Sequence, residues 1–389
     1  MHTVQTILQE HFGALAASGK LSAPQYRAGA ALRSCRTAAL GGHVQRCPNG
    51  HVQQVWYNSC RHRACPQCNG LAREQWLQRI RARLIDCAHR HVVFTIPHQL
   101  NVLWRLNTPA MMDALFAAAR DTLLELLADP RHLGAQAGIQ LALHTWTRAG
   151  ELHPHLHALV SEGGLADGVW VAPRRSHFLP ARVVMMLFRG KLLAALRALH
   201  RGEGLRLPDD MSAERFTSLL NRLGRKVKWN VRVCERYAHG QGVSLYLARY
   251  VKGGPLKNTQ IVSATASQVS FRYWPHTEPG GAKRSSILSL SPERFLARLL
   301  QHAPEPRRHT VRYYGLYAHA RSAQLNQARA LHAQAPVEPP VPIDWQGYLA
   351  RFASGPERTR CPQCHAALVR GPSMVAVRRA RLAPIRAPP

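Results

Sequence analysis

Five cysteines within a short stretch near the N-terminus constrain this chain more than any other feature. They are Cys35, Cys47, Cys60, Cys65 and Cys68. Cys65-Pro-Gln-Cys68 has the two-residue spacing with which one tight turn presents two thiolates to a tetrahedral metal. The stretch is irregular and could hardly fold without such a metal. We therefore expect a zinc site here rather than a disulfide framework.

The expected zinc site uses four of five candidate ligands. Cys47, Cys65 and Cys68 supply three of them, and either His51 or Cys60 supplies the fourth. Four protein ligands leave no open position, so this Zn²⁺ is expected to be structural. A second pair is a weaker signal, because Cys361-Pro-Gln-Cys364-His365 offers only three neighbouring candidates. Cys35 could join either group or neither.

The charge of the chain indicates a polyanionic partner. Its 52 Lys and Arg against 21 Asp and Glu give a formal net charge of +31. Such an excess points first to nucleic acid and second to an anionic membrane. The membrane is disfavoured, because no stretch approaches the roughly 20 apolar residues of a spanning helix. The first twelve residues do not resemble a signal peptide, so a reducing, cytoplasmic location is expected.

The 389 residues predict two or three domains, and hydrophobic periodicity divides them further. We expect a helix and zinc-binding domain over 1–88, a mixed α+β domain over 89–275, and a basic C-terminal region over 276–389 with a Pro-rich linker. Expected helices cover 4–15, 71–85, 110–127, 183–200, 213–223, 243–251 and 292–300. Expected strands cover 91–97, 139–147, 155–160, 227–234 and 268–274. The strand at 268–274 is expected to close the sheet of the middle domain.

A run of alternating histidines marks a candidate metal centre in the middle domain. In Glu151-Leu-His153-Pro-His155-Leu-His157, strand alternation places His155 and His157 on one face with Cα atoms about 7 Å apart. Two imidazoles at that spacing can share a divalent ion. The third ligand stays open between His144, His153 and Gln241. The remaining open positions suit Mg²⁺ or Mn²⁺ held together with substrate phosphate oxygens.

Two other histidines lie near an expected strand. His89 and His91 have no companion in the sequence, and we expect them to be surface or phosphate-facing residues.

Paired tyrosines provide a candidate nucleophile. Tyr246 and Tyr250 are four residues apart on an expected helix, so both hydroxyls project from one face. A tyrosine that attacks phosphorus forms a phosphotyrosyl link, which conserves the cleaved bond for later rejoining. A phenol is mostly protonated at neutral pH, so a metal or a cation such as Lys252 has to favour the phenolate. Alone, such a pair more often belongs to a core.

Together these residues resemble the HUH nucleases, and specifically the two-tyrosine rolling-circle transposases of the insertion sequence 91 family. The resemblance covers most of the first 320 residues. It is carried by Tyr57-Asn-Ser-Cys60 through Cys68, Val93-Phe-Thr-Ile-Pro97-His98, His144-Thr-Trp146, His153 through His157, Tyr246-Leu-Ala-Arg-Tyr250 and Tyr314-Gly-Leu-Tyr317. The chain departs from the family at Gly50-His51, where relatives often place a second cysteine after Cys47.

The resemblance implies a fold and a reaction. The fold is a five-stranded antiparallel sheet with the histidine pair on a central strand and the tyrosine helix packed opposite. The metal held by His155 and His157 polarises a scissile phosphate of single-stranded DNA while Tyr246 or Tyr250 attacks. The products are a 5′-phosphotyrosine and a free 3′-OH. Two tyrosines permit linked cuts at the element's end and at the target, which is the pattern of rolling-circle transposition of an insertion sequence.

Basic and aromatic side chains supply expected DNA contacts. The expected set is Arg61, Arg63, Arg73, Arg249, Lys252 and Lys257. The first three belong to the zinc segment and are candidates for binding a duplex or hairpin end of the element. Bases of a single strand can stack on tryptophans such as Trp104, Trp146 and Trp229, although core packing is the alternative for each.

Two other functions remain in competition with a transposase. A plasmid or phage replication initiator would cut DNA by the same chemistry. A non-catalytic, zinc-containing DNA-binding regulator would explain the charge and the cysteines equally well. The alternating histidine run argues against the regulator, which has no need of an open metal site. The sequence makes no prediction of the oligomeric state.

Overall fold

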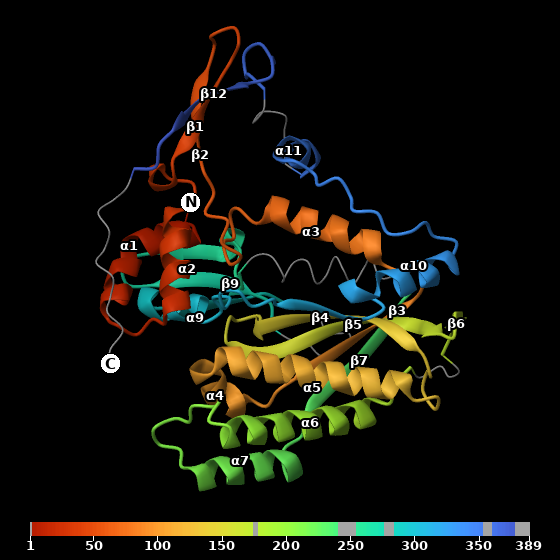
Figure 1. The fold of residues 1–389 in the computed structure, drawn as a ribbon. Coiled ribbons are helices and arrows are strands. Elements are labelled where there is room, and N and C mark those ends of the chain that lie inside the picture. The colour runs from red at the N-terminus through yellow and green to blue at the C-terminus, as the bar shows by residue number, and fades with distance from the viewer. Residues whose placement is uncertain (1, 174–177, 240–253, 276–283, 353–359, 378–389) are drawn as a thin grey trace. The chain divides into compact units, whose positions relative to one another are not determined.

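The computed structural model describes residues 2–173, 178–239, 254–275, 284–352 and 360–377, which form two compact units (Figure 1). The first unit comprises residues 1–75, 252–303 and 342–389, and the second comprises 76–251 and 304–341. Helix α3 (Gly70–Arg83) contains the boundary between them. The expected division into consecutive domains differs from this one, because the chain returns twice to the first unit after leaving it.

The second unit is built on one antiparallel sheet with the strand order β11-β4-β5-β3-β7, to which β6 adds by pairing with β5. The strands are β3 (His89–Thr95), β4 (Gln136–Trp146), β5 (Leu152–Ala166), β6 (Val169–Val171), β7 (Asn230–Tyr237) and β11 (Val311–Gly315). Among the described residues the sheet thus has six strands, where the resemblance implies five. β5 lies in the middle of the order and carries the histidine run.

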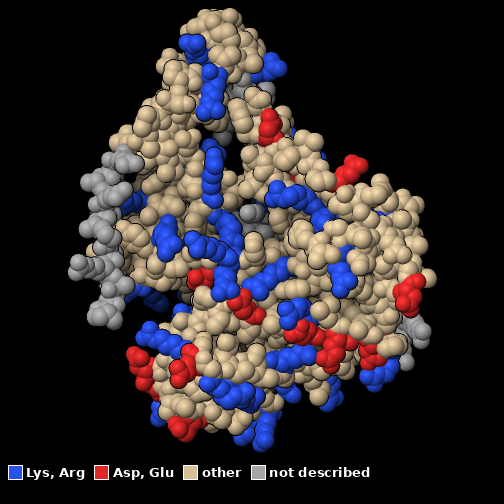
Figure 2. Space-filling model, in the orientation of Figure 1, with Lys and Arg blue, Asp and Glu red and all other residues tan. Residues whose placement is uncertain are grey.

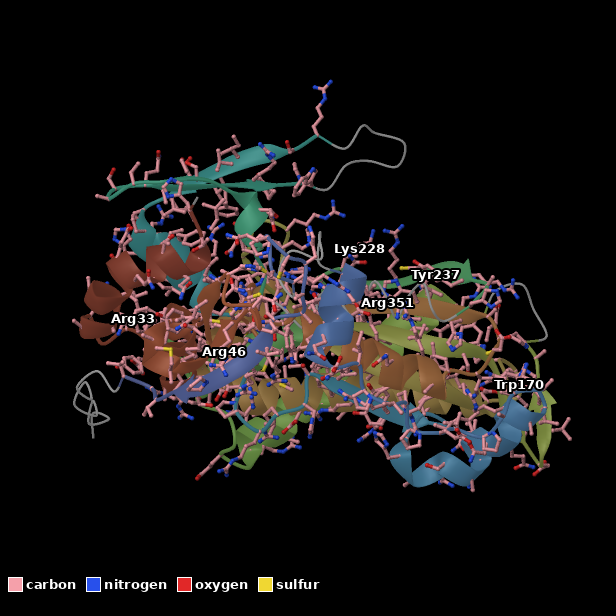
Figure 3. All side chains as sticks on the ribbon, turned by 90° about the horizontal axis from the view of Figure 1, so that it is seen from above. Arg33, Arg46, Trp170, Lys228, Tyr237 and Arg351 are labelled. Carbon is pink, nitrogen blue, oxygen red and sulfur yellow. The ribbon has the colours of Figure 1, made fainter. Side chains whose placement is uncertain are left out.

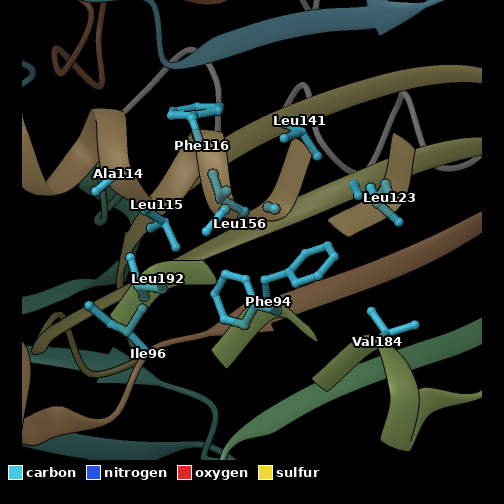
Figure 4. Packing of buried hydrophobic residues seen from close by; sticks show 14 of the residues in the cluster. Phe94, Ile96, Ala114, Leu115, Phe116, Leu123, Leu141, Leu156, Val184 and Leu192 are labelled. Carbon is cyan, nitrogen blue, oxygen red and sulfur yellow. The ribbon is translucent and has the colours of Figure 1, made fainter. Parts of the chain in front are cut away.

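One face of this sheet is covered by helices and buries a large apolar core. The helices are α4 (Asn101–Leu106), α5 (Thr108–Ala128), α6 (Ala181–Arg201) and α7 (Ala213–Arg225). Leu156 on β5 and Phe94 on β3 pair across the strands and contribute to this core with Phe116, Phe188 and Leu192 (Figure 4). Each of these five side chains is almost fully removed from water, so burial stabilises this layer by about 1.5–3 kcal/mol per side chain.

The opposite face of the sheet has a second, smaller apolar cluster. The C-terminal part of α3 and helix α10 (Ser322–Ala330) pack there against Leu159 and Tyr317. Gly138 makes room for the Tyr317 ring, because a Cβ at this position would lie 2.7 Å from it. The buried Tyr317 hydroxyl is 2.6 Å from His89 Nε2. Both faces of the sheet are therefore partly buried.

The first unit contains a second core built from segments distant in sequence. Helices α1 (Val4–Ala17), α2 (Ala23–Ser34) and α9 (Pro292–Leu300) pack with the sheet β10-β9-β8. Its strands are β8 (Ile261–Ala264), β9 (Val269–Tyr273) and β10 (Ser286–Leu290). The prediction that 268–274 closes the sheet of the middle domain is wrong. The reason is that Val269 and Phe271 find their apolar partners on α1 and α9 instead.

A separate three-stranded antiparallel sheet, β12-β1-β2, completes the first unit. Its strands are β1 (Gly42–Arg46), β2 (Gln53–Tyr57) and β12 (Val369–Met374), and helix α11 (Trp345–Phe352) precedes β12. Short 3₁₀ turns are η1 (Ala38–Leu40), η2 (His98–Leu100), η3 (Asn258–Gln260) and η4 (His319–Arg321). Over the described residues, no helix is both long and apolar enough to cross a membrane.

Candidate metal centres

Three histidines of the second unit converge on one face of its sheet. His144 on β4 is the register partner of His155 on β5, and His157 follows on the same face. The potential ligand atoms of these three residues all lie within 4.8 Å of one another. Ala142, the register partner of His157, has only a methyl side chain on that face. We call His144, His155 and His157 the histidine centre.

Hydrogen bonds orient two of these imidazoles. His155 Nδ1 lies 2.6 Å from the backbone carbonyl oxygen of His153. A carbonyl only accepts, so Nδ1 carries the proton and Nε2 of neutral His155 keeps its lone pair. His157 Nδ1 lies 2.7 Å from His91 Nε2, so one of these rings donates to the other. Both contacts leave Nε2 of the β5 histidines as the nitrogen available to a metal.

Burial keeps the histidine centre uncharged near neutral pH. It lowers the pKa of His155 to about 4. The pKa values of His144 and His157 are held well below 6.5, first by burial and then by the repulsion that neighbouring charged histidines would exert. A neutral imidazole is the form that binds metal. The centre is therefore ready to bind a cation without first releasing protons.

The candidates for the third ligand differ in position. His144 belongs to the group of converging ligand atoms, whereas His153 is outside it and contributes its carbonyl to His155. Gln241 lies outside the described residues, as do Tyr246, Tyr250, Arg249 and Lys252. The expected helix at 243–251 falls in the same segment.

His89 and His91 are buried, so the prediction that they face the surface or phosphates is wrong. His89 is 0% exposed and His91 is 7% exposed. His89 Nε2 is bonded to Tyr317, while His91 reaches His157 on the neighbouring strand. Tyr237, labelled in Figure 3 at the end of β7, places its ring centroid 6.5 Å from that of His91. Period-two alternation along 89–95 was the signal that could have placed His91 beside the histidine run.

A first cysteine cluster lies in the core of the first unit. It consists of Cys35, Cys60, Cys65 and Cys68, with all four sulfur atoms within 4.8 Å of one another. Cys35 ends helix α2, and the other three lie in the loop before α3. The Asn69 side-chain amide donates to the carbonyl oxygens of His62, Arg63 and Cys65, which fixes that loop. Hydrogen bonds, the strongest from Cys35, lower the pKa of the Cys68 thiol below its ordinary range.

A second cysteine cluster joins residues from opposite ends of the sequence. It consists of Cys47, His51, Cys361 and Cys364, whose ligand atoms are likewise all within 4.8 Å of one another. Cys47 and His51 lie in the turn between β1 and β2, and Cys361 and Cys364 lie in a turn before β12. The hydrogen bond from the backbone amide of Ala366 lowers the pKa of Cys364.

The expected single zinc site, drawn from Cys47, His51, Cys60, Cys65 and Cys68, is therefore divided between two clusters. The physical reason is the length of the β1–β2 hairpin. Cys47 and His51 lie at its tip, whereas Asn58 at its base bonds to Gly41. A five-residue strand spans roughly 16 Å, so ligands at the tip cannot reach Cys60. Cys35 takes the vacant position in the first cluster, and no sequence spacing reveals it.

The expected DNA contacts that can be placed differ in exposure. Arg61 and Lys257 are exposed, Arg73 is partly exposed, and burial lowers the pKa of Arg63. Figure 2 shows Lys and Arg spread widely over the face in view. Two of the tryptophans considered for base stacking are core residues, because Trp104 is 2% and Trp229 is 3% exposed. Trp146 is partly exposed, and its ring lies 5.7 Å from that of His144.

These features define a mixed α/β protein with a cysteine-rich metal-binding module and a separate histidine centre. Comparison with known families agrees with this class. A family model described as "Transposase zinc-binding domain" matches residues 7–96, and one described as "Putative transposase" matches residues 138–324. The residues matched by the zinc-binding model include all four cysteines of the first cluster, namely Cys35 and the three in the loop before α3.

Two curated relatives extend the match over most of the chain. A "Putative transposase y4qJ" of Sinorhizobium fredii is 36% identical over 355 residues, covering 89% of this chain and 88% of the relative. The "Transposase for insertion sequence element IS801" of Pseudomonas savastanoi pv. phaseolicola is 30% identical over 345 residues, covering 86% and 80%. The chain belongs to the insertion sequence 91 family of transposases, as the sequence resemblance indicates.

A solved structure was also found, the conjugative relaxase TrwC in complex with oriT DNA. It is 16% identical, covers 41% of this chain and 71% of that chain, and has a TM-score of 0.23. A similarity this low supports no argument about fold or function.

Proposed function

We propose that this transposase cleaves single-stranded DNA at the histidine centre and transfers the cut strand through a phosphotyrosine. The observation that carries the proposal is the convergence of His144, His155 and His157 in a transposase, on a sheet whose stability rests on a separate apolar core. Tyr246 and Tyr250 are the proposed nucleophiles. Rolling-circle transposition is the process that this chemistry serves.

The donor set of the histidine centre favours some divalent metals over others. Three neutral imidazoles suit Mn²⁺ and later transition metals better than Mg²⁺, which prefers oxygen ligands. The group of converging ligand atoms contains no carboxylate among the described residues. The residues therefore fit a divalent metal with open positions for phosphate oxygens, and among the two expected ions they favour Mn²⁺. When bound, that ion would withdraw electron density from the scissile phosphate.

His91 is proposed to position the ligand His157. When His157 binds metal through Nε2, its Nδ1 carries the proton and donates to His91 Nε2 across the 2.7 Å contact. The backbone carbonyl of His153 does the same for His155. Each β5 ligand thus has its ring orientation fixed by a neighbour that does not itself bind the ion.

Arg232 adds a positive charge to the face of the sheet that carries the histidine centre. It is the register partner of Val93 on β3, which in turn is the partner of His157 on β5. The three side chains share one face of the sheet, and Arg232 is exposed. An exposed guanidinium about 10 Å from the ligand, two strand spacings away, can hold a neighbouring phosphate of the strand being cut.

The proposed reaction exchanges one phosphodiester for another. The phenolic oxygen of Tyr246 or Tyr250 bonds to phosphorus, and the bond from phosphorus to the 3′ oxygen breaks. The phenolic proton is lost to solvent or a nearby base, and the departing oxygen takes up a proton to become the 3′-OH. The second tyrosine can repeat the cut at the target, and an incoming 3′-OH reverses the first link.

The test is covalent capture on single-stranded oligonucleotides that tile the DNA flanking the gene. With Mn²⁺, the protein should form a denaturant-resistant adduct with the fragment on the 3′ side of the cut, joined through its 5′-phosphate, and should release the other fragment with a free 3′-OH. The double variant Tyr246→Phe, Tyr250→Phe should give no adduct. Tyr237→Phe, which removes the hydroxyl of a tyrosine whose ring lies 6.5 Å from that of His91, is the matched control and should keep the adduct.

The outcomes separate the competing assignments. An adduct in the double variant would show that another residue is the nucleophile. No adduct from the wild-type protein on any tiled strand, with DNA binding retained, would favour the non-catalytic regulator. Cutting without joining to a second target strand would favour the replication initiator.

A further inference from the structure

The second cysteine cluster has the geometry of a tetrahedral metal site. Cys47 Sγ lies 3.4 Å from Cys364 Sγ and 3.8 Å from His51 Nδ1. His51 Nδ1 in turn lies 3.9 Å from Cys361 Sγ. Zinc–sulfur bonds of 2.3 Å place tetrahedral sulfur ligands about 3.8 Å apart. The sulfur atoms are too far apart for a disulfide, which needs about 2.05 Å.

Both halves of the cluster are tight turns that present two ligands each. In the first, Cys47 N donates to Val52 O and Gly50, with φ of +77°, lets the chain reverse toward His51. In the second, Cys361 N donates to Ala366 O and His365 N donates to Cys361 O. Two such turns facing each other are the arrangement by which zinc ribbons hold their metal.

The sheet that carries this cluster has almost no apolar core of its own. None of the apolar clusters found among the described residues includes a side chain from β1, β2 or β12. Val55 and Val369 are more than two-fifths exposed. Small three-stranded sheets need a buried apolar face or another constraint to persist in water. Something other than hydrophobic burial therefore has to hold this sheet together.

The C-terminal segment nevertheless docks closely on the N-terminal one. Gly41 is the clearest sign, because a Cβ there would lie 2.6 Å from Met374 O. Val377 N donates to Ala38 O, and the Gln75 side chain donates to Ile343 O at 2.8 Å. The ring of Trp345 on α11 lies 6.3 Å from that of Trp56 on β2. These contacts lie near the two ends of the segment, at Ile343 and Trp345 and at Met374 and Val377.

We infer that Cys47, His51, Cys361 and Cys364 bind a second structural Zn²⁺ that fastens the C-terminal segment to the β1–β2 hairpin. Both matched family models leave Cys361 and Cys364 outside their ranges. The inference concerns metal content and chain connectivity, so it stands independently of the proposed nuclease chemistry.

The direct test is zinc stoichiometry of the full chain purified in a phosphine reductant. After dialysis against a moderate chelator that empties the open three-histidine centre, elemental analysis should find two Zn²⁺ per chain in the wild type and one in Cys361→Ser, Cys364→Ser. The matched control is Cys87→Ser, Cys234→Ser, which alters two cysteines outside both clusters and should keep two. One Zn²⁺ in the wild type, or two in the Cys361/Cys364 variant, would overturn the inference.

A second pair of variants covers the case in which the double serine variant fails to fold. His51→Cys preserves the number of ligands and should keep two Zn²⁺, with a cobalt-substituted spectrum shifted toward four sulfur ligands. His51→Ala should lose the second Zn²⁺ to a moderate chelator. Equal zinc retention by the two variants, or a cobalt spectrum unchanged in His51→Cys, would exclude His51 and the proposed site.

Limited proteolysis tests the fastening itself. Trypsin should release the segment that follows Arg370, within β12, at least tenfold faster from the zinc-deficient variant than from the wild type, because the metal no longer protects that strand. An unchanged release rate would show that the metal does not hold the segment.

Discussion

The two units use clustered metal-binding side chains under opposite physical conditions. In the second unit, apolar clusters pack on both faces of the sheet, and the histidine centre offers three ligands and no fourth among the described residues. In the first unit, each cysteine cluster offers four ligands, and one cluster lies on a sheet without an apolar core. Four protein ligands close a site, whereas three leave room for substrate. Under the proposed function, the metal of the second unit serves chemistry, whereas the metals of the first unit serve folding.

The largest expected effect is therefore on stability and is confined to the first unit. Cys65→Ser should remove one Zn²⁺ and unfold the region around α1, α2 and α9, because structural zinc contributes on the order of 10 kcal/mol to folding. Cys65 is 1% exposed and packs in that core. Amide hydrogen exchange, read separately for the two units, measures the effect.

The matched control for that experiment is His155→Ala in the second unit. It should leave protection of β4 and β5 nearly unchanged, because the core on the other face of the sheet remains. If His155→Ala unfolded its unit as Cys65→Ser does, the contrast between the units would be lost.

A smaller effect is expected at His91. His91→Leu removes the acceptor for His157 Nδ1 and should weaken Mn²⁺ binding by about 10–100-fold, the usual cost of losing such a partner. His91→Gln offers an amide oxygen in its place and should recover much of the affinity. Isothermal titration with Mn²⁺ measures both, and His98→Gln on an exposed neighbour is the control. Equal affinities for the Leu and Gln variants would show that His91 only fills space.

The smallest expected effect is that of pH on metal binding. Because the pKa of His155 is lowered to about 4 and those of its partners are also lowered, the ligands stay neutral well below pH 6.5. Mn²⁺ affinity should change less than about twofold between pH 7.5 and 6.0. Three imidazoles with an ordinary pKa of 6.5 would lose roughly fifty-fold through proton competition. A loss of that size would show that the centre is not desolvated.

Hydrophobic periodicity predicted many helices and strands, because the apolar residues of an element recur on the face that is buried. The helices expected at 110–127 and 183–200 are α5 and α6, and the hairpin that places His144 beside His155 is β4–β5. The family could be predicted because its short motifs contain the residue types that metal binding and the expected reaction require. Each of these predictions depends on residues close together in sequence.

The parts that sequence did not predict all depend on distant contacts. Cys35, at the end of α2, lies beside Cys65 in the core of the first unit, and Cys361 lies beside Cys47 although 313 residues separate them in sequence. The segment 268–274 has a strand pattern, but nothing in that pattern says which sheet it joins. His91 meets His157 only through the register of β3 on β5, which the alternation along 89–95 does not specify by itself.

The most direct test of the central claim is the covalent-capture assay applied to His155→Ala. The account predicts loss of the adduct by at least a thousandfold, with zinc content unchanged and retention of the single-stranded oligonucleotide within a few-fold of wild type. That result would assign the histidine centre to chemistry rather than to folding. Adduct formation by His155→Ala at the wild-type rate, with Mn²⁺ still required, would contradict it.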